Sequence, residues 1–294
     1  MLTLRAGIAQ TRSLVESSAT QLPALSNFIK ARTVRGRKLA ETVSGILAGP
    51  ELKTVIDFIR VHGVNVLGVR EEASLANLRL YPAFESPSKA CSFPVVAFNP
   101  KYLAGRKPQD QSDAVEHELW HLYLRVAFPR FAENRSLVSA SLAFVAPQLL
   151  PSFWLSSEHF FLRTAAILSG RADFAARDSR VSLAHHLANC SSPEFMRIPE
   201  VHLDFVAAGF FLDFVLPFCS CGGTAGDVAK TNTRDLLIWM LTIPGLSGRA
   251  FQLADELTAV CRDRSGNVRV DDSMLKVSDL IAFRLHSSRV APQC

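Results

Sequence analysis

The sequence lacks an uninterrupted apolar run of the kind that crosses a bilayer. One charge-free stretch, Ser136 to Ser157, is long enough, but it contains Pro147, Pro151 and several serines. Two packed helices joined near Pro147 explain it better than one span. A second apolar run, from Phe205 to Cys219, is shorter and has Asp213 in its middle, which is typical of a buried core helix. We therefore expect no membrane insertion.

Acidic residues are almost absent from the first 40 positions. Glu16 is the one acidic residue there, against a basic set of Arg5, Arg12, Lys30, Arg32, Arg35, Arg37 and Lys38. Such a start is typical of an organellar transit peptide or of a basic, loosely ordered arm, and we favour the arm. No secretory signal is expected. Nucleic acid is a weakly supported partner, because no aromatic residues interleave with the basic ones.

The six cysteines lack the paired spacing of a structural metal site. Cys219-Ser220-Cys221 has no second pair with ligand spacing, so a soft metal there is a minor alternative. Scattered cysteines in a chain of 294 residues without a secretory signal indicate reduced thiols. We therefore expect a cytoplasmic protein.

The apolar pattern is mixed at first and helical later. A helical pattern over 41–62 is followed by three strand-like runs, 64–69, 78–84 and 93–98. Beyond residue 110 the pattern is helical over 111–128, 131–145, 151–169, 180–189, 200–218, 232–243, 249–262 and 273–285. This order predicts an α+β fold that is mainly helical, with a small three-stranded sheet before the helix of 111–128 and a helical C-terminal region.

The strongest candidates for metal binding and catalysis lie in one motif, His117-Glu118-Leu119-Trp120-His121. Residues four apart lie on one face of a helix, so His117 and His121 can present two imidazoles to a single zinc ion. Glu118 projects beside the metal, where its carboxylate can act as general base toward a zinc-bound water. The competing interpretation is a pair of core histidines satisfied by hydrogen bonds.

The helical context supports this motif. Asp113 and Glu116 have the spacing of a helix cap, and Pro129 ends the helix. An apolar stripe is expected to bury one face of it, made of Val115, Leu119, Leu122 and Val126 and widened by Trp120 and Leu124.

The third ligand is expected from the helix of 151–169, which Pro151 begins and Gly170 ends. Glu158 is a carboxylate on an otherwise apolar face of this helix, and a buried carboxylate needs a cation. His159 is the alternative, either as the ligand or as a group that orients the site. The remaining candidates have no ligand spacing and are expected to be structural or surface residues: His185, His186 and His202.

With these residues the chain resembles a zincin metallopeptidase of the gluzincin type, and its layout from Val64 to Leu168 is most similar to the compact ImmA/IrrE-like peptidases. The resemblance implies His117, His121 and Glu158 as zinc ligands and Glu118 as general base. It also implies that the segment from Val95 to Pro100 is an edge strand that pairs with an extended peptide substrate. The gap from His121 to Glu158 is longer than this family has.

This interpretation divides the chain into a basic arm (1–40), a zincin-like catalytic domain (41–170) and a helical region of unassigned role (171–294). The leading hypothesis is a zinc-dependent metallopeptidase that hydrolyses a protein or peptide bond. The alternative is a catalytically silent zinc-binding regulatory or interaction protein that keeps the zincin frame.

Overall fold

The structure is a computed structural model that describes residues 33–34, 37–42, 49–64, 67–71, 78–85, 92–98, 106–131, 150–190, 200–219, 221–243, 246, 249–262, 268–270, 276–277, 279–280 and 283–284. Its contacts divide the chain into two compact units. The N-terminal unit ends at Ala127 and the C-terminal unit begins at Phe128. The sequence had placed α7, Leu150–Leu168, with the motif helix, whereas the contacts group it with the helices that follow.

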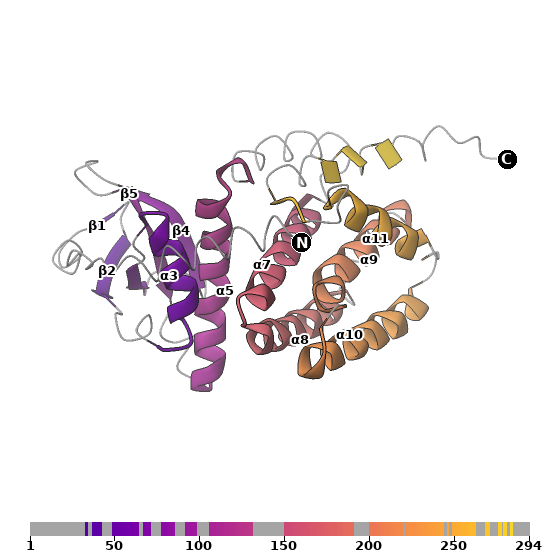
Figure 1. The fold of residues 1–294 in the computed structure, drawn as a ribbon, viewed down its shortest axis with the longest axis horizontal. Helices are drawn as coiled ribbons and strands as arrows, with labels where there is room; N and C mark the ends of the chain where they lie inside the picture. The colour runs from indigo at the N-terminus through magenta and orange to yellow at the C-terminus, as the bar shows by residue number, and fades with distance from the viewer. Residues whose placement is uncertain are drawn as a thin grey trace. The chain divides into compact units, whose positions relative to one another are not determined.

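In its described residues, the N-terminal unit combines one sheet with two helices (Figure 1). The strands are β1 (Thr33–Val34), β2 (Arg37–Thr42), β3 (Leu67–Glu71), β4 (Leu78–Glu85) and β5 (Ser92–Phe98), and the helices are α3 (Lys53–Val61) and α5 (Pro108–Ala127). The strand order is β1-β2-β3-β5-β4. β3 and β5 are parallel, and the other neighbouring pairs are antiparallel. The helix α5 contacts α3, β4 and β5.

The prediction of a small three-stranded sheet is wrong. The backbone sheet has five strands, and two of them come from 33–42, which the sequence assigned to the basic arm and the start of a helix. Where side chains are described as well, 83% of the residues are helical and none lies in a strand. The sequence of β1 and β2 has no alternating apolar pattern, so it does not indicate strands. These segments form strands because their backbone groups pair with neighbouring strands.

The expected edge strand is also corrected. β5, which contains the predicted segment Val95 to Phe98, lies inside the sheet between β3 and β4. The edge position belongs to β4, which pairs antiparallel with β5. A parallel partner far along the chain, β3, takes the second side of β5, and such long-range pairing leaves no local sequence signal.

The motif helix α5 is fixed by its apolar side. Val115, Leu119 and Leu122 are buried as predicted, together with Trp120 and Leu124. Phe58 of α3 packs against Trp120, with ring centroids 6.2 Å apart. α5 begins at Pro108, so Asp113 and Glu116 lie within the helix instead of capping it. Proline is favoured in the first turn because it has no backbone N–H to leave unsatisfied.

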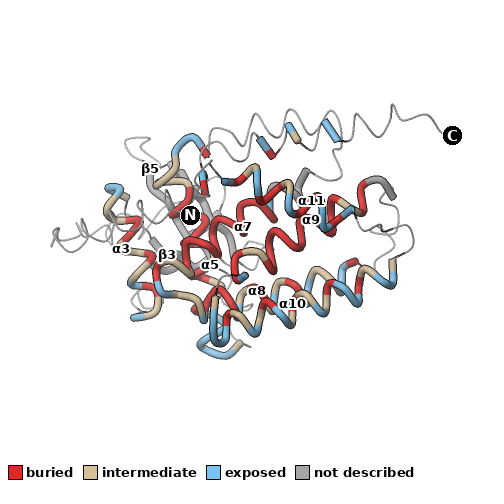
Figure 2. Tube along the Cα trace, turned by 45° about the vertical axis from the view of Figure 1, so that its right-hand side comes forward, coloured by how far each residue is buried: buried red, intermediate tan, exposed pale blue. Residues whose placement is uncertain are grey.

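The C-terminal unit is a set of packed helices. They are α7 (Leu150–Leu168), α8 (Ala172–Asn189), α9 (Glu200–Phe214), the short 3-10 helix η3 (Leu216–Phe218), α10 (Gly223–Thr242) and α11 (Arg249–Val260). α9 contacts both α7 and α11, and α8 contacts α10. Figure 2 shows continuous buried stretches along α7 and α9. Among the residues described, no helix is long and apolar enough to cross a membrane.

Helix ends follow the sequence where a special residue fixes them. Gly170 ends α7 with φ of +87°, and the Arg171 N–H donates to the carbonyl of Ala166 at 2.8 Å, as in a glycine-terminated helix. α8 and α10 begin earlier than predicted, at Ala172 and Gly223. The helix predicted at 131–145 lies almost entirely outside the described residues, as does most of the one at 273–285.

Candidate metal centre

The two motif histidines meet on α5. The Nε2 atoms of His117 and His121 are 3.1 Å apart, and their rings are 4.7 Å apart and nearly perpendicular. Two nitrogens that bind one zinc ion tetrahedrally at ordinary bond lengths are roughly 3.3 Å apart. The observed separation is close to this value, so the pair fits a shared metal ion. The same spacing also fits a hydrogen bond from one Nε2–H to the other ring.

Burial differs along the motif. His121 is buried, whereas His117 and Glu118 are half-buried. Glu118 follows His117 directly and therefore leaves the helix roughly 100° around its axis. Its half-buried carboxylate is therefore accessible to solvent beside the histidine pair.

A buried hydrogen bond holds the neighbouring face of α5, roughly 100° around the helix axis from the two histidines. Trp120 is fully buried and donates its indole N–H to Oε1 of Glu116 at 3.3 Å, and Glu116 is itself fully buried. Tyr123 packs edge-on against Trp120, with centroids 5.5 Å apart. Because these side chains fill the core, they set the rotation of α5 and thereby the direction in which the histidines project.

In the C-terminal unit, α7 presents two neighbouring candidates. Glu158 and His159 are both buried, at 2% and 4% exposure. The Nδ1 of His159 lies 3.1 Å from Oδ2 of Asp213, which belongs to α9. A metal-ligating histidine commonly donates its second ring nitrogen to a carboxylate in this way. His159 therefore has the surroundings of a ligand that binds through Nε2.

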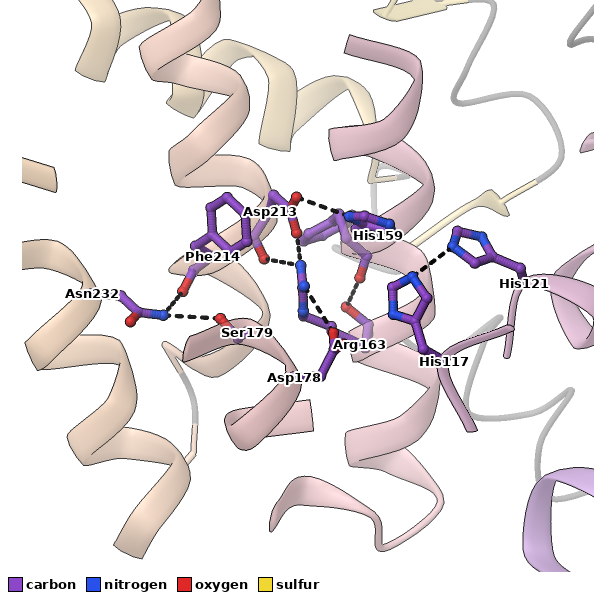
Figure 3. A network of polar contacts seen from close by, with 11 residues as sticks. His117, His121, His159, Arg163, Asp178, Ser179, Asp213, Phe214 and Asn232 are labelled. Atoms are coloured by element: carbon purple, nitrogen blue, oxygen red, sulfur yellow. Dashed lines mark hydrogen bonds and ion pairs between the residues drawn. The ribbon is translucent and has the colours of Figure 1, made fainter. Parts of the chain in front are cut away.

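A buried arginine continues this contact. Arg163 forms an ion pair with the Asp213 carboxylate, donates to the Asp213 carbonyl at 3.2 Å, and donates to Oδ2 of Asp178 at 2.9 Å. Its guanidinium also lies 5.0 Å from the ring centroid of Phe214. Burial lowers the pKa of Arg163, and the nearby Asp178 carboxylate opposes that shift. Figure 3 shows these side chains joined in one network.

The candidate metal donors agree with the sequence prediction except at the third ligand. Among the described residues, the candidate metal-binding histidines are His117 and His121 of the N-terminal unit and His159 of the C-terminal unit. The first two are the predicted ligands and the third is the predicted alternative. Glu158, the expected third ligand, is buried as anticipated but is not in this group. All three donors are imidazoles, which suit zinc, copper, iron and nickel alike, so the donors do not identify the metal.

The other cysteine and histidine candidates lie elsewhere. Cys219 and Cys221 form no donor group with a third ligand among the described residues, and burial raises the pKa of both thiols. His185 is exposed, and His202 is buried. His186 packs against the rings of Phe210 and Phe214, as expected for a structural residue.

Sequence reasoning missed the network around His159. Asp213 had served only as evidence against a membrane span, although a single charge inside an apolar helix already signals a buried partner. Arg163 lies four residues after His159 on the same helix and gave a similar signal. Asp178 gave no such signal in the sequence, because its partner Arg163 is identified only by the packing of α7 against α8.

Comparisons with known proteins add no relative: no family model, characterised protein or solved structure matches this chain.

Proposed function

We propose that this chain is a zinc-dependent hydrolase of the metallopeptidase type, with His117, His121 and His159 as zinc ligands. The observation that carries the proposal is the 3.1 Å separation of the two Nε2 atoms on α5, next to a half-buried glutamate. The buried His159, with Nδ1 directed at Asp213, supports its choice as third ligand. Three histidine ligands leave one coordination position open, as catalytic zinc sites require.

A bound zinc ion would polarise a carbonyl group and lower the pKa of a bound water to about 7. Glu118 supplies the accompanying proton transfer: its carboxylate accepts a proton on the side of the attacking group and returns it to the leaving amine. Trp120 and Glu116 keep the motif helix in place from the core side. In this mechanism Glu118 is required for turnover but not for binding the metal.

The sheet supports an extended peptide as the class of substrate. β4 is at one end of the strand order, pairs only with β5 among the described strands, and contacts α5. An edge strand offers backbone N–H and C=O groups to an extended peptide. A peptide bound along β4 would lie beside the helix that carries Glu118. We therefore propose an extended segment of a protein or peptide as the substrate.

The first experiment compares two glutamates of α5. Glu118→Gln is expected to abolish hydrolysis of a casein or peptide-library substrate while the protein still binds one equivalent of zinc. Glu116→Gln is the matched control, because Glu116 lies two residues away and glutamine keeps an oxygen that can accept the Trp120 indole N–H, so the helix is expected to keep its position. It is expected to keep its activity. Wild-type protein without stoichiometric zinc, or a Glu118→Gln variant as active as wild type, would refute the peptidase proposal.

A second experiment identifies the third ligand. His159→Gln is expected to lose most of its bound zinc on dialysis, and Glu158→Gln is expected to retain it. The reverse result would assign the ligand to the carboxylate that the sequence favoured. Both residues are buried neighbours on α7, so circular dichroism of each variant controls for misfolding.

A further inference from the structure

The contacts of His159 form a chain of charges across three helices. From α7, His159 contacts Asp213 of α9 through Nδ1 at 3.1 Å, and Arg163 pairs with the same carboxylate. Arg163 also donates through Nη2 to Asp178 of α8 at 2.9 Å. The side chains of His159, Asp213 and Arg163 are 5%, 3% and 0% exposed, so these three groups are removed from water.

This arrangement determines which ring nitrogen of His159 carries the proton. Arg163 forms an ion pair with the Asp213 carboxylate, and a guanidinium has donors but no acceptor. An ionised carboxylate can only accept hydrogen bonds. The Nδ1 of His159 is therefore the donor toward Asp213, which places the lone pair of the neutral ring on Nε2, the nitrogen that would bind a metal.

Packing alone is a weak explanation for these groups. Desolvating ions costs free energy that their attraction often fails to return, and buried ion pairs are frequently no more stabilising than apolar side chains of similar size. Arg163 would bridge α7 and α8 through Asp178 without any contact to a histidine. The additional carboxylate, shared between Arg163 and His159, is what an oriented ligand requires.

We propose that Asp213 is a positioning residue that orients the His159 ring as an Nε2 donor, and that Arg163 holds the Asp213 carboxylate in place. The inference rests on the proposed role of His159 as a metal ligand. It adds a dependence of metal affinity on a residue of α9, 54 positions away in the sequence.

Asp213→Asn tests the inference, and Asp178→Asn is its matched control. An asparagine at 213 would direct its carbonyl oxygen to Arg163 and its NH₂ group to Nδ1, which moves the ring proton to Nε2. Zinc affinity is then expected to fall about 10- to 100-fold. Asp178→Asn removes a carboxylate from the same guanidinium, at Nη2, and is expected to change zinc affinity less than about threefold.

The tautomer itself is measured on zinc-free protein from the ¹⁵N shifts of the His159 ring. Wild type and Asp178→Asn are expected to carry the proton on Nδ1, and Asp213→Asn on Nε2. An unchanged tautomer in Asp213→Asn, or an equal loss of zinc affinity in both variants, would overturn the inference. Wild-type protein that binds no zinc would instead refute the proposed function, and the tautomer measurement would still decide the role of Asp213.

Discussion

Replacing Trp120 with phenylalanine tests whether the core side of α5 is held as the structure shows. Phenylalanine keeps an aromatic ring against Phe58 and Tyr123 but removes the indole N–H that bonds to Glu116 at 3.3 Å. Removing one partner of a buried hydrogen bond costs about 1–3 kcal/mol. The smaller ring adds about 0.5–1.5 kcal/mol for lost burial and the space left behind. The total expected loss of unfolding free energy is about 1.5–4.5 kcal/mol.

The assay is urea denaturation followed by circular dichroism, in EDTA so that metal binding does not contribute. Glu116→Gln provides the second arm of a double-mutant cycle, because it keeps an acceptor but removes the buried carboxylate. Trp120→Phe is expected to cost about 1 kcal/mol less when it is combined with Glu116→Gln than when it is made in wild type. A loss below about 0.5 kcal/mol in wild type would contradict the reasoning, since surface substitutions fall in that range.

Three further predictions concern other parts of the chain. Gly170→Ala should lower the unfolding free energy by about 1–2 kcal/mol in urea denaturation, because φ is +87° there while no neighbouring atom would obstruct a Cβ. The pKa of His186 is lowered by burial and then by the nearby charges of His185 and Arg163. The unfolded state therefore binds more protons than the folded state, and stability is lost as pH falls through about 6.5. His186→Gln should reduce the loss of unfolding free energy measured between pH 7.5 and pH 5. Burial raises the pKa of Cys190 and Cys261 to about 12, so mass spectrometry after iodoacetamide treatment of folded protein at pH 7.5 should find both far less modified than the exposed Cys219.

The motif pair was predictable because helix geometry is local. A spacing of four residues places His117 and His121 on the same helix face, independent of the rest of the chain. The apolar stripe from Val115 to Leu122 determines which face is buried. Gly170 was equally predictable as the end of α7, since positive φ favours glycine. Periodicity and backbone sterics act over a few residues, so the sequence records them directly.

The sheet was less predictable, because strand pairing joins distant segments. The runs near β3, β4 and β5 are visible in the sequence, but their order is not: β5 pairs with β3 on one side and β4 on the other. β1 and β2 lie in a basic segment without a strand-like apolar pattern. The edge position of β4 is therefore a result of the tertiary structure.

The sequence by itself determined the motif helix, the pairing of its histidines and the adjacent Glu118. The tertiary structure alone decided the partners of the third histidine. His159 and Asp213 meet across 54 residues, and Arg163 meets Asp178 across 15, because α7, α8 and α9 pack together around a buried charge. Five consecutive residues are enough to place two histidines on one helix face. The partner of a buried charge, in contrast, depends on which helix packs against it in the tertiary structure.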